Sequence, residues 1–239
     1  MLMSAAKIRF DKSGYYFIGL ACIVFAGFWR SYFSKFFTGN NDYNFYFHFH
    51  ATLALLWVSM LIVQPILIRK KKITIHKILG KVSYVFMPLL LLSVLLILNH
   101  SLKQVTEEQR TFSNVLVVVR DIFLLSVAFT IGVWYRSHVQ MHARAMVVTG
   151  IVFIEPALAR LMSGVIFKGQ GATGFMVTAG VIIVLLIILI IKERGQKKAR
   201  WLFPVLLGIY LLAYTIIFFE IQLSFLDGII KWYAVLPLT

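Results

Sequence analysis

Seven apolar runs, each about as long as a bilayer is thick, recur along this chain of 239 residues. A helix rises 1.5 Å per residue, so roughly 20 apolar residues cross the hydrocarbon core of a membrane. The runs cover about residues 15–32, 46–68, 78–98, 114–135, 145–167, 175–191 and 201–222. Lipid offers no hydrogen bonds to the backbone, so each run is predicted to be a helix. We therefore expect an all-α, polytopic transmembrane bundle of seven helices.

The composition agrees with a membrane protein. Hydrophobic residues make up 60% of the chain and the mean hydropathy is +0.87, whereas soluble domains are about 45–50% apolar. The connections are short and we find no internal repeat, so residues 1–239 are expected to form one domain. The first apolar run is too long for the core of a signal peptide, and we expect it to be the first spanning helix.

The net charge of +15 is explained by orientation in the membrane. On a soluble protein it would suggest nucleic-acid binding, but here most of the basic residues lie in the short loops on one side. These are Lys7, Arg9, Lys12, Arg69, Lys70, Lys71, Lys72, Lys77, Lys81, Arg136, Arg144, Lys192, Arg194, Lys197, Lys198 and Arg200. The side richer in Lys and Arg is normally cytoplasmic. We expect a multi-pass protein of the bacterial cytoplasmic (inner) membrane, with its N-terminus in the cytoplasm and its C-terminus outside. The aromatic segment 227–239 is expected at the interface, and no nucleic-acid partner is expected.

Ionisable residues inside the apolar runs are the first candidates for a functional site. Each costs roughly 2.5–3.5 kcal/mol to insert, so such residues usually face the bundle interior and mark function. The candidates are His48, His50, Arg120, Asp121, Glu155, Arg160 and Glu220. Their depths favour an Asp121–Arg160 pair, with Arg120–Glu155 as the rival pairing. The group is interpreted either as a pocket for a substrate, proton or cofactor or as a salt bridge that only fixes helix packing.

Helical spacing links three polar or aromatic residues of the second run. His50, Trp57 and Gln64 are seven residues apart, so they share one stripe of a helix. A polar stripe along a spanning helix is expected to face other helices. His48 points away from this stripe and is expected among the neighbouring aromatic residues. His100, after the third run, is interpreted as a loop residue that could join His50 near the outer surface.

Three histidines lie on the basic side. His76 precedes the third run, and His138 and His142 precede the fifth at a spacing of four. Such a pair suits zinc on a helix, but the usual acidic partner is missing from this loop. Ligation of heme b by His76 with His142 or His138 is one hypothesis, and a solvated basic loop is the alternative. His142 and Arg160 are five whole turns apart, so both are expected to face the bundle core.

Several motifs resemble an uncharacterised family of bacterial polytopic membrane proteins. The residues are His48-Phe49-His50, His76-Lys77-Ile78-Leu79-Gly80 and His142-Ala143-Arg144-Ala145-Met146. They match its HxH, H-K/R-x-L-G and HxRxM motifs over about two-thirds of the chain. The resemblance implies a membrane bundle but no activity. The second to fifth runs are also loosely similar to the four-helix core of cytochrome b561-type proteins, which implies heme ligation by histidines on paired helices. The fourth run has no histidine, so only His76 with His142 or His138 fits that pattern.

Three classes of function remain open. The first is a redox protein that holds heme b through His76, His142 or His138, with His50 as an outer site that meets quinone. The second is a small-molecule or proton-coupled transporter that uses an outer polar cluster. Its candidate residues are His50, Trp57, Gln64, Arg120, Asp121, Glu155 and Arg160. The third is a structural or assembly subunit of a membrane complex, and a membrane-embedded metal hydrolase ranks below these.

Overall fold

The computed structural model describes residues 12–40, 42–195 and 199–239. Within these ranges the regular elements are all helices and no strand is present, so the expected all-α fold is confirmed. Lys7, Arg9, Lys197 and Lys198, which entered the charge comparison, lie outside the described residues.

Six helices of the described chain are long and apolar enough to cross a membrane. They are α1 with its continuation (Ser13–Phe37), α3 (Phe45–Arg69), α4 (Ile73–Lys103), α5 (Phe112–Trp134), α6 with its continuation (Val139–Ile166) and α7 (Gly171–Lys192). The last predicted run forms a shorter apolar helix, α8 (Leu202–Phe218). Short helices follow the longer ones: η3 (Glu107–Gln109), η5 (Ser224–Leu226) and α9 (Asp227–Val235). The chain is thus compatible with a multi-pass membrane protein.

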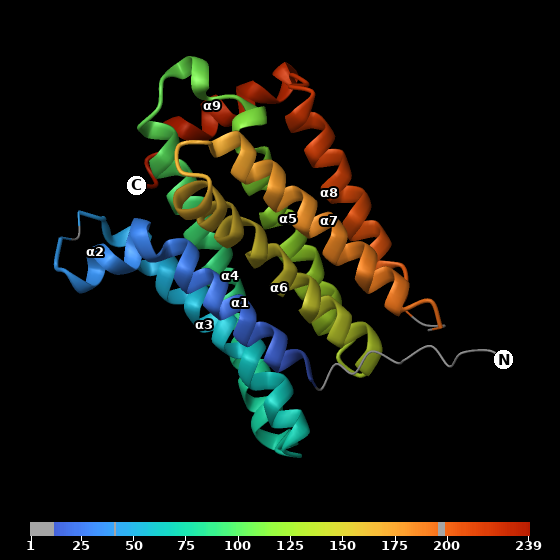
Figure 1. The fold of residues 1–239 in the computed structure, drawn as a ribbon. Coiled ribbons are helices and arrows are strands. Elements are labelled where there is room, and N and C mark those ends of the chain that lie inside the picture. Colours follow the sequence, from blue (N-terminus) through green and yellow to red (C-terminus); the bar gives the residue numbers. More distant parts are fainter. Residues whose placement is uncertain (1–11, 41, 196–198) are drawn as a thin grey trace.

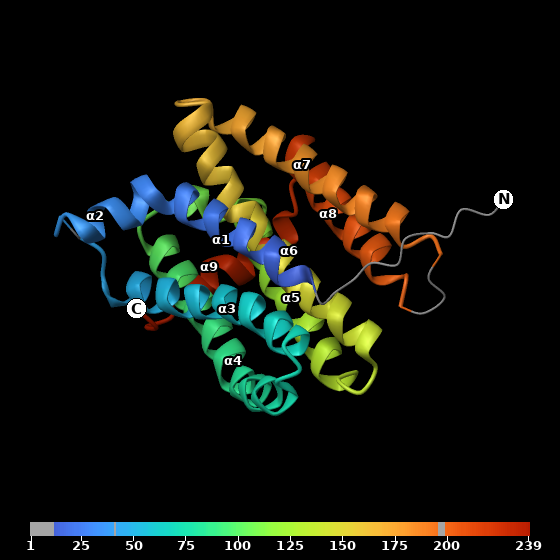
Figure 2. The same ribbon diagram turned by 60° about the horizontal axis from the view of Figure 1, so that its bottom comes forward.

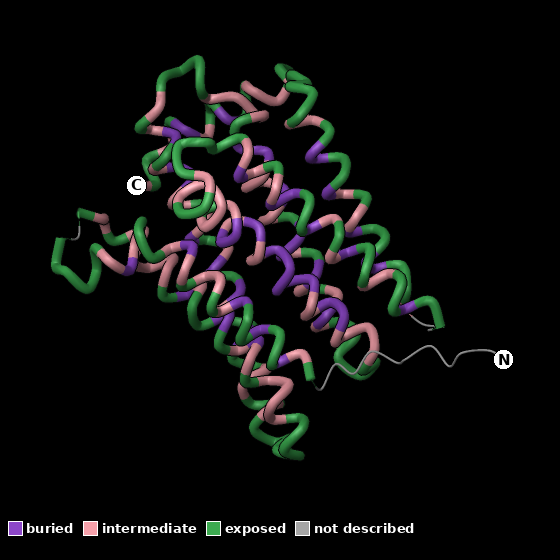
Figure 3. The backbone as a smooth tube through the Cα atoms, viewed as in Figure 1, coloured by how far each residue is buried: buried purple, intermediate pink, exposed green. Residues whose placement is uncertain are grey.

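The helices form a bundle with α5 and α6 in its middle. Figures 1 and 2 show α5 and α6 between the α3–α4 pair and the α7–α8 pair, with α1 against α3 and α6. Buried residues are densest along α6, while the outer sides of the other helices are exposed (Figure 3). An apolar outer surface of this kind is expected where lipid is the solvent.

Close packing of α1 on α6 depends on a glycine. The spanning helix α1 (Ser13–Phe28) continues through the π-helix η2 (Trp29–Phe33) into α2 (Ser34–Phe37), and α6 (Val139–Leu161) continues into the π-helix η4 (Met162–Ile166). A Cβ atom added to Gly27 would lie 2.1 Å from the Ala157 carbonyl oxygen. Small residues allow such close backbone approach between membrane helices, so Gly27 fixes how α1 lies on α6.

The two ends of the bundle differ in character. At the end we call the basic end, α3 stops at Arg69 and α4 starts at Ile73, with three lysines between them. Arg69 Nη1 donates to the Tyr15 hydroxyl at 2.7 Å, so the start of α1 lies there too.

At the opposite end, α9 packs against the last turns of α4. Asn99 Nδ2 donates to the Tyr233 carbonyl oxygen at 2.7 Å, and Lys103 Nζ donates to the Thr239 carbonyl oxygen at 2.6 Å. The start of α1 and Thr239 therefore lie at opposite ends of the bundle.

Glu220 does not lie within a helix. Helix α8 ends at Phe218, and Glu220 follows it as an exposed residue with a positive φ of 50°. The prediction that Glu220 lies within the last apolar helix was therefore wrong. Its side chain is exposed at the turn that follows α8.

Candidate functional site

A buried ion-pair network joins α5 and α6, two of the helices long enough to cross a membrane. Arg120 lies eight residues after the start of α5, about 12 Å along the helix. Its Nη2 donates to Asp121 Oδ1 at 2.7 Å and also to Glu155 Oε2, and its Nε donates to Asp121 Oδ1 at 3.1 Å. Arg120 and Glu155 are almost wholly buried. One guanidinium group thus donates hydrogen bonds to two carboxylates.

Two tyrosines of α8 complete this group. The guanidinium carbon of Arg120 lies 4.3 Å from the ring centre of Tyr210 and 5.8 Å from that of Tyr214. Both tyrosines are fully buried, and the Tyr214 hydroxyl lies beside the Glu155 carboxylate. We call Arg120, Asp121, Glu155, Tyr210 and Tyr214 the ion cluster. Sequence reasoning missed the tyrosines, although their spacing of four in an apolar helix was a usable signal.

The ion cluster has unused hydrogen-bonding capacity. Among the described residues, Arg120 Nη1 and Tyr210 Oη have no hydrogen-bond partner. Tyr214 Oη and Glu155 Oε1 make no hydrogen bond of good geometry, although the hydroxyl lies beside the carboxylate. Buried polar groups in proteins are nearly always paired, and exceptions call for a role or a missing partner. When both carboxylates are ionised, the cluster also carries one negative charge more than positive. Donors and an acceptor therefore remain free for a proton or a small polar molecule.

Arg160 does not belong to the ion cluster. Its guanidinium lies 4.5 Å from the ring centre of Phe28, and its Nη1 donates to the Pro156 carbonyl oxygen at 3.0 Å. The expected Asp121–Arg160 pair was wrong, and the rival Arg120–Glu155 pair forms instead. Arg160 is also exposed, against the expectation that it faces the core. Residues 155 and 160 lie on different sides of α6, and only Glu155 faces α5 and α8.

The histidines near the α9 end have separate partners. Ser93 Oγ gives its single proton to the Leu90 carbonyl oxygen at 2.6 Å, so His50 Nδ1 donates to Ser93 Oγ at 3.0 Å. His48 Nδ1 is 2.8 Å from the Tyr32 hydroxyl, on another side of α3, as the spacing predicted. His100 contacts Asn44 and does not join His50.

The predicted polar stripe of α3 faces other helices. Trp57 is buried against Phe129, with 5.7 Å between ring centres, and its Nε1 has no partner among the described residues. Gln64 reaches His76 and Gly80 of α4. The stripe therefore runs from His50 at one end of the bundle to the histidines at the other.

The structure brings two of the three histidines at the basic end together. The rings of His76 and His142 have centres 6.4 Å apart and planes at 89°. His138 lies apart, with its ring 5.8 Å from that of Tyr135. Of the candidate ligands, only His76 and His142 could share a cofactor or metal ion. The described part of the chain has no group of three or more His, Cys, Asp and Glu side chains that could hold a metal ion.

A second buried ion pair lies at the basic end of the bundle and joins α6 to the end of α7. Arg144 Nε donates to Glu193 Oε1 at 2.6 Å, and both residues are buried. Glu193 follows the last residue of α7, outside the spanning segment. Burial raises the pKa of the Glu193 carboxyl, while the charge and hydrogen bond of Arg144 oppose that shift. Arg144 was counted only as a loop charge, so sequence reasoning missed this pair.

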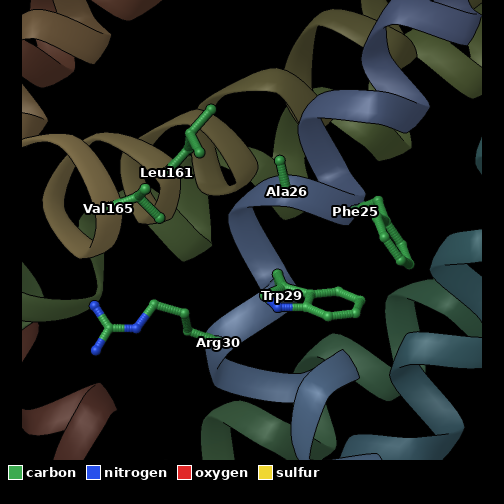
Figure 4. Close-up of a pocket in the computed structure, with 6 residues that line it drawn as sticks. All are labelled: Phe25, Ala26, Trp29, Arg30, Leu161 and Val165. Carbon is green, nitrogen blue, oxygen red and sulfur yellow. The ribbon is translucent and has the colours of Figure 1, made fainter. Parts of the chain in front are cut away.

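An apolar groove lies apart from the ion cluster. It has a volume of about 430 Å³ and lies between α1 with η2 and α6 with η4 (Figure 4). Its lining residues are Phe25, Ala26, Trp29, Arg30, Leu161 and Val165. Arg30 Nη1 donates to the Gly164 carbonyl oxygen at 2.6 Å across it. The groove offers an apolar surface with one cation at its edge.

No protein-family model, curated protein or solved structure matches this chain.

Proposed function

We propose that this protein is a proton-coupled carrier or binding protein for a small polar solute, and that the ion cluster is its site. The observation that carries the proposal is the pair of unpaired buried donors on Arg120 and Tyr210, beside a Glu155 carboxylate that the guanidinium covers at one oxygen only. In a cluster that only held helices together, we would expect every buried polar group to have a hydrogen-bond partner. A buried donor or acceptor without one costs roughly 1–3 kcal/mol.

Each residue has a distinct task in this proposal. Glu155 takes the proton, because Arg120 covers only one of its two oxygens. A proton there removes the excess negative charge of the cluster, which is expensive in an apolar medium. Arg120 Nη1 and the two tyrosine hydroxyls orient the solute. Asp121 holds the guanidinium in place through two hydrogen bonds.

The basic residues of the loops orient the chain in the membrane. The protein lies in the bacterial inner membrane with the basic end in the cytoplasm, in agreement with the positive-inside rule. With α8 as a seventh crossing, the C-terminus is outside. The ion cluster then lies in the outer half of the membrane.

Proton movement driven by solutes in proteoliposomes tests this function. Vesicles containing the purified protein and the pH dye pyranine are given amino acids, monocarboxylates, sugars and monovalent cations in turn. We expect one class to drive proton uptake in the wild type, with at least a tenfold loss in Glu155→Gln. Arg194→Gln, which removes an exposed charge at the basic end, is the matched control and keeps the response. A wild-type protein that moves no protons with any class contradicts the proposal.

A further inference from the structure

We infer that the apolar groove between α1 and α6 binds one anionic phospholipid, with the lipid phosphate at Arg30 and an acyl chain along the groove. This site lies apart from the ion cluster and does not depend on the carrier function. It is supported by the order of residues along the two walls, by the charges around the groove and by the winding of both helices.

Charged and apolar residues follow each other along the groove in the order found in a phospholipid. Helices α1 and α6 run in the same direction, because Gly27 lies against Ala157 and, further along both chains, Arg30 reaches Gly164. Phe25 precedes Arg30 by five residues, roughly 7.5 Å of helix, and therefore lies deeper in the membrane. The arginine is thus placed for a phosphate near the surface, and the groove for a chain that points to the bilayer centre.

The walls of the groove are open to lipid. Figure 4 shows Trp29 and Arg30 on the side of α1, and Leu161 and Val165 on the side of α6. Trp29 and Val165 are both exposed. Tryptophan is enriched at the level of the lipid headgroups, so Trp29 marks the height at which the headgroup of a bound lipid would lie.

The cation at the edge of the groove has no carboxylate partner. Arg30 is exposed, and none of the ion pairs among the described residues includes it. Its guanidinium has five N–H donors, and the Gly164 carbonyl oxygen accepts one hydrogen bond from it. The remaining donors suit the oxygens of a phosphate, which arginine can bind in a bidentate manner.

The surroundings of Arg30 favour an anionic headgroup. Residues 12–40 and 156–192 contain no Asp or Glu, and the next acidic residue after Arg30 is Asp42, in the loop beyond α2. The other cations of these two stretches near the α9 end are Lys35, Arg160 and Lys168. Basic groups near a membrane surface attract anionic lipids, whereas a zwitterionic lipid brings a cation of its own.

Both helices change their winding where the headgroup would lie. Arg30 belongs to the π-helix η2 and Gly164 to the π-helix η4. Among the described residues only these two π-helices occur, and the hydrogen bond from Arg30 to Gly164 joins them across the groove. Short π-helical turns are rare and are frequently found at functional sites, so their pairing here singles out this part of the surface.

Quenching of Trp29 fluorescence by brominated lipids tests the site. The purified full-length chain is reconstituted in phosphatidylcholine vesicles with rising fractions of brominated phosphatidylglycerol or brominated phosphatidylcholine. The part of the quenching that is missing in Trp29→Phe reports on the groove. We expect phosphatidylglycerol to reach half of it at an about fivefold lower mole fraction, the preference that one arginine gives an anionic lipid. Equal mole fractions for the two lipids would overturn the inference.

Variants separate the headgroup contact from the chain contact. Arg30→Gln should abolish the preference for phosphatidylglycerol, and Arg30→Lys should keep it. Ala26→Phe fills the groove and should abolish the preference although the arginine remains. Lys231→Gln, which removes an exposed cation of α9 at the same end of the bundle, is the matched control. A preference equal to that of the wild type in Arg30→Gln or Ala26→Phe would overturn the inference.

Native mass spectrometry gives a readout that does not depend on the folding of a variant. Wild-type protein is released from mild detergent that contains phosphatidylglycerol and phosphatidylcholine in equal amounts. We expect one phosphatidylglycerol molecule to stay bound per chain. Retention of both lipids to the same extent, or of neither, would contradict a specific site.

Discussion

At the scale of single residues, Arg120 and Glu155 have opposite expected effects. Arg120 is the only cation in the ion cluster and faces two carboxylates, so its removal leaves two buried negative charges without a partner. Neutralising Glu155 instead leaves a balanced Arg120–Asp121 pair. If the salt bridge only fixed helix packing, removing Arg120 and removing Glu155 would destabilise the protein by similar amounts.

This asymmetry gives a stability prediction. Arg120→Gln is expected to lower the free energy of unfolding by about 3–5 kcal/mol, the usual cost of breaking a buried pair. Glu155→Gln is expected to change it by less than about 1 kcal/mol, because the amide keeps the shape and removes the excess charge. Unfolding in detergent, with Arg194→Gln as the exposed control, measures both. Equal large losses in the two variants would favour the packing interpretation.

At the scale of elements, the contact between α1 and α6 positions both walls of the apolar groove and one wall of the bundle core. Gly27 on α1 has the Ala157 carbonyl oxygen against it, whereas Gly19 on the same helix has nothing within 4 Å of an added Cβ. The chain therefore provides its own matched pair of glycines.

Gly27→Ala is expected to destabilise the protein by about 1–3 kcal/mol, because the new methyl group overpacks the helix interface. Gly19→Ala is expected to leave stability unchanged or to raise it by up to about 1 kcal/mol, since alanine favours helices. Thermal unfolding in detergent compares the two. If the two variants unfold at the same temperature, α1 does not approach α6 as closely as described.

Elements were the most predictable part of this structure. Apolar length predicted seven spanning helices, because lipid forces long helices on such runs. Six of them are long and apolar enough to cross a membrane, and the seventh run forms the shorter α8. The end of α8 was misplaced because the apolar pattern continues past Phe218 and hides the turn at Glu220.

The site was less predictable than the helices. Arg120, Asp121 and Glu155 were found from their cost in lipid. Their depths favoured the Asp121–Arg160 pair over the observed Arg120–Glu155 pair, because depth along a helix does not give the side that a residue faces. Tyr210 and Tyr214 were missed because tyrosine in an apolar run is usually interfacial or packed. His76 and His142 were predicted together, and only the packing of α4, α5 and α6 separated them from His138.

At the scale of the whole molecule, topology is the main prediction. The start of α1 and the residue Thr239 lie at opposite ends of the bundle. Reporter fusions should therefore place the N-terminus in the cytoplasm and the C-terminus outside. A fusion after Thr239 with cytoplasmic activity would mean that α8 does not cross, and would contradict the proposed topology.

Infrared difference spectroscopy of the carboxyl groups tests the central claim, that the ion cluster exchanges protons and is not a fixed salt bridge. Wild-type protein and Glu155→Gln are titrated in H₂O and in D₂O. We predict a protonated-carboxyl band in the wild type that appears as the pH falls, shifts in D₂O and is missing in Glu155→Gln. Identical spectra from the two proteins would contradict the account, because Glu155 would then never take up a proton.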